Sequence, residues 1–220
     1  MPDYIPRNDK IHKGTHIDFE SFGRNQYSTH PPPVLIGFLR EGGFKQVVFT
    51  QDYKWAAKDS GVEHDVEFFP NRNEYLLQML EGVSSVNRPL FAYSIHEKIV
   101  ISKLLDQNID RSYRNVKRLA EAEINRRRSR SPGALPEVPE IIPKTLEGLA
   151  EALGIPMQHK LPRGGVTSRL RQVSKYSKSQ KAWEKAPKKV RKAWIEVLRH
   201  NKEDVCILPE ILLKLKKLNP

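Results

Sequence analysis

Two carboxylates, Asp18 and Glu20, stand one residue apart in the run THIDFES, residues 15–21. The run has the character of a short strand, in which residues i and i+2 point to the same face. Two like charges on one face repel each other unless that face is wet or a cation lies between them. The spacing therefore makes Asp18 and Glu20 candidate ligands of a divalent cation.

A third carboxylate, Asp204, lies in the C-terminal segment, residues 187–218, which the apolar periodicity predicts to be helical. The same period places Asn201 and Asp204 on the buried side, and His200 comes one turn before Asp204. The stripe that defines this side is Val190, Trp194, Val197, Val205 and Leu208. A buried carboxylate costs free energy unless it is paired or bound to metal. Three carboxylates converging from distant segments suit a hard divalent cation.

Plainer interpretations of the same residues stay open. A D-x-E tripeptide is common by chance, and Asp204 and His200 are equally compatible with solvated positions at a frayed helix. His200 also fits simple packing against the edge of a sheet. The combination of the two segments, rather than either one, supports a cation site.

The elements that must position these residues follow from pattern. Strands are predicted at 15–21, 32–40, 44–51 and 88–94. Helices are predicted at 52–61, 73–83, 96–106, 114–127, 144–155 and 187–218, with Pro209 breaking or kinking the last. The turn Glu41-Gly42-Gly43 predicts an antiparallel hairpin. The order predicts an α/β fold, with a mixed sheet packed against helices.

Length and composition limit the possible domain organisation and location of the protein. We expect a polar tail at 1–13 and one domain at 14–220, with a basic loop around 126–143 and a basic insertion around 159–185, irregular or loop-like. A mean hydropathy of −0.60 and the lack of a long apolar run predict no membrane span. One cysteine excludes an internal disulfide. With no secretory signal evident, we expect a cytoplasmic protein.

The net charge of +12 favours a polyanionic partner, most often nucleic acid, although an ordinary basic surface remains an alternative. The basic residues form two groups. The first is Arg126, Arg127, Arg128 and Arg130. The second is Arg163, Arg169, Arg171, Lys175, Lys178 and Lys181. Phe22, next to the D-x-E run, is a candidate for stacking on a base, with packing an equal alternative.

These motifs resemble the DEDD exonucleases of the ribonuclease H-like superfamily. THIDFESFG is similar to the first motif, with Asp18, Glu20 and Gly23 matching and Phe22 departing. HNKEDVCIL, 200–208, is similar to the last motif, although its spacing is that of the tyrosine subclass while its residue is His200. LFAYSIHEKIVISKLL, 90–105, stands where the middle motif has an aspartate, and offers Glu97 instead. KTLEGLAEALGI, 144–155, is similar to the helix before the last motif.

The resemblance covers about 14–215 and implies a ribonuclease H-like sheet, an antiparallel three-strand meander continued by parallel strands. It implies hydrolysis of phosphodiester bonds with two Mg²⁺ or Mn²⁺ ions, usually from the free 3′ end of DNA or RNA. Asp18 would bridge the ions, Glu20 and Asp204 would complete the first site, and Glu97 would support the second. His200 would orient or deprotonate the attacking water.

Other functions remain possible on the same residues. One is a ribonuclease H-like protein that binds nucleic acid but has lost efficient catalysis, which the Glu97 departure permits. Another is an interaction module whose basic surface docks an acidic protein, and this would bind no divalent cation. A structure-specific endonuclease or a transposase-like enzyme would also fit the fold, because fold does not fix chemistry.

Overall fold

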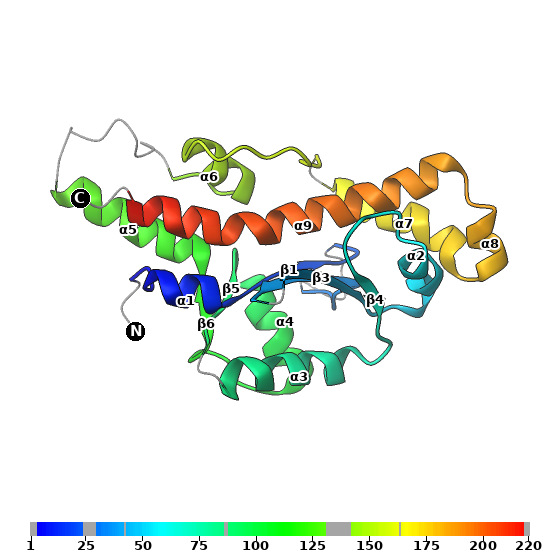
Figure 1. The fold of residues 1–220 in the computed structure, drawn as a ribbon, viewed down its shortest axis with the longest axis horizontal. Coiled ribbons are helices and arrows are strands. Elements are labelled where there is room, and N and C mark those ends of the chain that lie inside the picture. The colour runs from blue at the N-terminus through cyan, green and yellow to red at the C-terminus, as the bar shows by residue number, and fades with distance from the viewer. Residues whose placement is uncertain are drawn as a thin grey trace.

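A six-stranded mixed sheet forms the centre of the protein (Figure 1). The computed structural model describes residues 4–23, 30–41, 43–85, 88–130, 142–162 and 164–217. The strands are β1 Thr15–Glu20, β2 Leu35–Arg40, β3 Gly43–Val48, β4 Val66–Phe68, β5 Leu90–Ala92 and β6 Tyr113–Asn115. Their order across the sheet is β4-β3-β2-β1-β5-β6.

The sheet combines an antiparallel meander with parallel strands. Strands β1, β2 and β3 pair antiparallel, which confirms the predicted hairpin, while β5 and β6 continue in parallel from β1. The register brings Asp18 opposite Gly37, and Gly37 opposite Gln46. This is the ribonuclease H-like mixed sheet that the resemblance implied, extended at one edge by β4.

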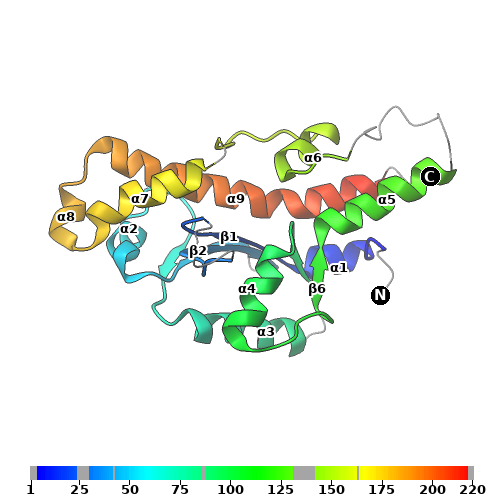
Figure 2. The same cartoon turned by 180° about the vertical axis from the view of Figure 1, so that it is seen from behind.

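Helices cover both faces of the sheet. The helical segments are α1 Asn8–Lys13, η1 Gln51–Tyr53, α2 Lys54–Lys58, α3 Arg72–Ser85, α4 His96–Leu105, α5 Val116–Arg130, α6 Leu146–Ala152, α7 Gly165–Ser177, α8 Gln180–Glu184 and α9 Lys188–Lys217. Helix α9 lies across one face, and α3 and α4 lie on the other (Figures 1 and 2). Helix α7 packs beside the first half of α9, and α5 beside its second half.

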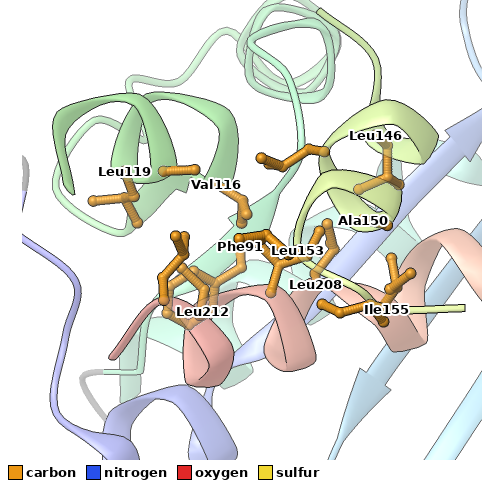
Figure 3. Close-up of a cluster of buried hydrophobic side chains, with 14 of the residues drawn as sticks. Phe91, Val116, Leu119, Leu146, Ala150, Leu153, Ile155, Leu208 and Leu212 are labelled. Atoms are coloured by element: carbon orange, nitrogen blue, oxygen red, sulfur yellow. The ribbon is translucent and has the colours of Figure 1, made fainter. Parts of the chain in front are cut away.

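The alternation along β1 separates apolar from polar side chains. Ile17 and Phe19 join the hydrophobic cluster formed with α3 and α4. His16, Asp18 and Glu20 therefore point to the opposite face, the one that α9 covers. A second cluster gathers around α2, α7 and the first half of α9. A third joins α5, α6 and the second half of α9, where Leu208 and Leu212 meet Phe91 (Figure 3).

Several predicted boundaries are wrong. Residues 8–13 form α1, with Ile11 fully buried, rather than belonging to a tail. Residues 126–130 complete α5 rather than starting a loop, and 131–141 lie outside the described residues. The basic segment after His159 contains the regular helices α7 and α8. The predicted helix at 52–61 is shorter, formed by η1 and α2.

Pro209 does not break the last helix. Helix α9 runs through it without interruption, although proline removes one backbone hydrogen bond and crowds the preceding turn. The neighbouring side chains Ile207, Leu208, Ile211 and Leu212 are all buried in the cluster of Figure 3. This burial offsets the cost of the proline, which is why propensity alone misplaced the boundary.

Candidate active site

Four carboxylates from three elements lie in one neighbourhood, around Glu20. Asp18 and Glu20 come from β1, Glu97 from the first turn of α4, and Asp204 from α9. Glu20 is 8% exposed and Glu97 is 5% exposed. The Glu20 carboxylate lies within electrostatic reach of the other three. The structure thus brings together all the carboxylates that the sequence singled out.

Burial and mutual repulsion raise the pKa of every one of these groups. For Asp18, burial raises the pKa to about 7, against a hydrogen bond from Asn201 that lowers it. For Glu97, burial and then the charge of Asp18 raise the pKa to about 8. Burial raises the pKa values of Glu20 and Asp204 well above their usual range, and neighbouring carboxylates add to the effect. A cation among these groups would favour their ionised forms.

His200 is oriented toward Asp204. Its Nδ1 lies 3.1 Å from the His159 carbonyl oxygen, and its Nε2 lies 3.6 Å from Asp204 Oδ2. A carbonyl oxygen only accepts, so Nδ1 of a neutral ring must carry the hydrogen and Nε2 must hold the lone pair. Burial lowers the pKa of His200, which favours that neutral ring at pH 7. The ring thus presents a proton acceptor to the carboxylate cluster.

The other carboxylates are held by hydrogen bonds from neutral groups. The side-chain amide of Asn201 donates to Asp18 Oδ2 at 2.8 Å and to the Asp18 carbonyl at 3.2 Å. Ser94 Oγ donates to Glu97 Oε2 at 3.1 Å. Within the described residues, no lysine or arginine forms an ion pair with any of the four carboxylates. Among the described residues, then, no basic side chain neutralises these carboxylates through an ion pair, and protons or a bound cation would have to do so.

A cavity of about 390 Å³ opens beside the cluster. Glu20 and His200 line one side of it, and the first residues of α7, 165–167, line another. Glu147, from α6, also lines it, and its charge acts on Asp18, Asp204 and His200. Sequence reasoning missed Glu147, because an acid in the first turn of an amphipathic helix normally serves only the helix dipole.

A second hollow of about 530 Å³ continues from this cavity along α7. The two share Gly23, Gly164 and Thr167. Arg171 and Lys175 line the second hollow, together with Phe22. Phe22 also packs against Tyr53, with ring centroids 6.1 Å apart, which agrees with the packing alternative, while its stacking on a base stays a prediction. This hollow is called the α7 groove below.

The remaining predicted contact residues lie in different settings. Arg169 is held by an ion pair to Glu196, with 2.6 Å between Nε and Oε2. Lys178 is exposed and lies 3.7 Å from Asp52 Oδ2. Arg126, Arg127 and Arg128 belong to the last turns of α5, near the C-terminal end of α9 and remote from α7 (Figures 1 and 2). Arg163 lies outside the described residues.

Arg127 is a structural residue rather than a surface contact. It is 5% exposed, its Nε donates to Glu123 Oε1 at 2.9 Å, and its Nη2 donates to the Leu215 carbonyl at 2.6 Å. The bond to Leu215 joins α5 to the end of α9. We therefore leave Arg127 out of any surface for nucleic acid.

The donor set can be tested for its fit to a divalent cation. Four carboxylates provide the hard oxygen ligands that Mg²⁺ and Mn²⁺ prefer. Asp204 Oδ1 is buried and, among the described residues, has no hydrogen-bond partner. As their side chains stand, no three Asp, Glu, His or Cys residues of the described chain are gathered closely enough to hold a metal ion. The ligand types fit, while binding would require the carboxylates to turn toward one another.

Comparison of the chain with family models, with curated proteins and with solved structures gave no match. The assignment of a function therefore depends on the geometry described above. In the part of the chain that the structure describes, no helix has both the length and the apolar character needed to cross a membrane.

Proposed function

We propose that this chain is a metal-dependent nuclease, most simply a 3′–5′ exonuclease of DNA or RNA, similar to the DEDD enzymes. The observation that carries the proposal is the group of four neighbouring carboxylates, Asp18, Glu20, Glu97 and Asp204, beside a ribonuclease H-like sheet. Glu20 and Glu97 are buried, and Asp18 and Asp204 are half-buried. Bringing four carboxylates together, two of them buried and two half-buried, costs free energy, and a binder or a docking module would gain nothing from it. A cation-binding site explains the cost.

Asp18, Glu20 and Asp204 would hold a first ion, and Glu97 would support a second. When bound, paired Mg²⁺ or Mn²⁺ ions stabilise the charges of the attacking and leaving oxygens in phosphodiester hydrolysis. The chain itself supplies a base, because His200 Nε2 presents its lone pair on the same side as Asp204. Asn201 fixes the Asp18 carboxylate by donating to Oδ2.

The substrate path runs from the acidic cavity along the α7 groove. The N-terminal residues of α7 line the cavity, where a helix terminus favours phosphate oxygens. Arg171 and Lys175 then provide cations for the next phosphates, and Phe22 offers a ring on which a base can stack. The substrate that we expect is a single-stranded 3′ end.

The test is degradation of 5′-labelled single-stranded DNA and RNA with Mg²⁺, Mn²⁺ or EDTA. We expect a ladder that shortens from the 3′ end, needs the metal, and disappears in Asp18→Ala and Asp204→Ala. Circular dichroism must show that both variants are folded. The proposal is contradicted if the wild-type protein degrades neither the DNA nor the RNA oligonucleotide, whether Mg²⁺ or Mn²⁺ is present.

One observation favours a second candidate, a nucleic-acid-binding protein with weak or no catalysis. The carboxylates of the described chain do not converge into a ready ligand group, and Glu97 stands where the family has an aspartate. This alternative predicts binding of single strands that weakens with salt and is unchanged in Asp18→Ala. A cytoplasmic location remains a prediction from the sequence.

A further inference from the structure

A chain of buried amide groups links Asp18 to the opposite edge of the sheet. Asn201 donates to Asp18 Oδ2 at 2.8 Å, and Gln46 Nε2 donates to Asn201 Oδ1, also at 2.8 Å. At the far end, His64 Nε2 lies 2.6 Å from Gln46 Oε1. Gln46 and Asn201 are both fully buried. The three side chains come from α9, β3 and the loop before β4.

The register of the sheet makes this series of hydrogen bonds possible. Asp18, Gly37 and Gln46 form one row across β1, β2 and β3. A Cβ on Gly37 would lie 2.2 Å from Asn201 Oδ1, well inside contact distance. Only glycine on the middle strand leaves room for the Asn201 amide to reach both neighbours.

The direction of the hydrogen bonds is dictated by two backbone carbonyls, which can only accept. Gln46 Nε2 also donates to the Leu198 carbonyl at 2.9 Å, so Gln46 must turn Oε1 toward His64. Asn201 likewise donates to the Asp18 carbonyl at 3.2 Å. His64 must therefore be a donor through Nε2. Each group donates to the next, and the series ends at the Asp18 carboxylate. This series of hydrogen bonds, from His64 through Gln46 and Asn201 to Asp18, is called the run below.

His64 is well placed to act as the fixed end of the run. It is partly buried and packs edge-on against Phe44, with ring centroids 5.0 Å apart. Burial, followed by the charge of Lys202, lowers its pKa to about 4, so the ring is neutral near pH 7. A neutral ring has one N–H, and the geometry requires it on Nε2. His64 also lines a separate cavity of about 470 Å³, together with Arg199 and Lys202.

We propose that His64 and Gln46 are positioning residues for the active site, which orient the Asn201 amide and through it the Asp18 carboxylate. The inference rests on the proposed function only for its effect on metal binding, because the hydrogen-bonded run itself does not depend on a metal. Donation from one end strengthens donation at the other, since hydrogen bonds in a buried run polarise one another. Outer partners of this kind hold a ligand in its binding orientation.

The first measurement needs no metal. Long-range ¹H–¹⁵N NMR of the full chain should show His64 as the Nε2–H tautomer. His64→Leu should shift the side-chain amide signals of Asn201, which His64 reaches only through Gln46 in the series of hydrogen bonds, and His64→Gln should restore them, because its amide again donates. Arg199→Gln is the control, since Arg199 is exposed and lines the same cavity outside the run. An Nδ1–H tautomer, or Asn201 signals unchanged in His64→Leu, overturns the inference.

The second measurement is Mn²⁺ affinity by calorimetry. We expect Gln46→Met and His64→Leu to weaken binding, by on the order of tenfold for Gln46→Met, with recovery in His64→Gln. His64 is partly exposed, so its variants remain informative if Gln46→Met does not fold. Equal affinity in wild type and His64→Leu overturns the positioning role. If wild type binds no Mn²⁺, the proposed function fails, and the NMR measurement still decides the inference.

Discussion

The Asp18 carboxylate is subject to two opposing influences. Burial raises its pKa to about 7, while the Asn201 amide donates to it and favours the charged form. The pKa of the neighbouring Glu97 is raised to about 8 by burial and by the charge of Asp18. Near neutral pH the protein therefore holds protons on these carboxylates, and a divalent cation would have to displace them.

This proton binding predicts a particular dependence of stability on pH. The unfolded chain releases these protons near the ordinary values of 3.8 for Asp and 4.5 for Glu, whereas the folded protein keeps them to about 7 and about 8. Between the unfolded-state and the folded-state values the folded protein thus binds more protons, so the free energy of unfolding falls as pH rises and levels off once the folded-state values are passed. His16 and His64, whose pKa values are lowered, act in the opposite sense only below about 6.5.

We therefore expect the melting temperature in EDTA to fall from about pH 6.5 to about pH 8.5. Asp18→Asn should flatten this decline, because it removes one of the titrating groups, and should be more stable than wild type at the upper end. Differential scanning calorimetry on both proteins checks it. A decline of the same steepness in Asp18→Asn would show that Asp18 is not one of the groups responsible.

Gly37 offers a second prediction at this scale. Alanine at this position would press on Asn201 Oδ1, which the hydrogen bonds on either side prevent from yielding easily. We expect Gly37→Ala to lower the free energy of unfolding by about 1–3 kcal/mol, through crowding and a lost hydrogen bond. Gly82→Ala, in α3 with open space around its Cβ, is the matched control and should be neutral or mildly stabilising. Equal unfolding midpoints in urea would contradict this account.

At the scale of elements, the two basic groups lie in different places. Arg171 and Lys175 of α7 line the groove that opens from the acidic cavity. Arg126 and Arg128 lie in the last turns of α5, near the end of α9 that contains Leu215. Leu215 lies about three helical turns beyond Asp204. The sequence showed both groups and favoured the second only slightly, because charge runs carry no information on distance from a site.

The α7 position predicts which cations bind nucleic acid. The double variant Arg171→Gln/Lys175→Gln should weaken binding of a single-stranded oligonucleotide and reduce the slope of log affinity against log salt by roughly 1.4, about 0.7 for each lost phosphate contact. Fluorescence anisotropy over a salt series measures this. Arg126→Gln/Arg128→Gln removes the same charge elsewhere. An equal loss in both double variants would mean that net charge, rather than the groove, governs binding.

Helices and strands with strong local sequence patterns were predicted well, and those with weak patterns were predicted poorly. The hairpin at 41–43, the first-motif strand and the last helix were all placed from their own residues. The three-residue strands β4 and β6 were missed, because so short a run has no readable period and exists only by pairing with its neighbours. The Gln46–His64 pair was missed because only the fold brings it near Asp18, and Glu147 because an acid in a first helical turn normally serves the helix dipole.

At the scale of the whole molecule, α9 connects the separate parts. Its first half packs in the cluster with α2 and α7, and its second half in the cluster with α5 and α6 (Figures 1 and 3). His200, Asn201 and Asp204 lie between the two halves. A continuous helix transmits order between its ends, so damage to either cluster should disturb the site and the rest of the fold together.

Leu212→Ala tests this coupling. Leu212 is fully buried in the cluster with α5 and α6, and its truncation should cost about 2–5 kcal/mol. The tryptophans, Trp55, Trp183 and Trp194, all belong to the other cluster, so their fluorescence reports on the opposite half of α9. If α9 makes one cooperative unit, the urea midpoint seen by fluorescence falls in Leu212→Ala by as much as the midpoint seen by far-ultraviolet circular dichroism. Two separated transitions would instead show that the halves unfold independently, and that the carboxylate site lies across a boundary between them.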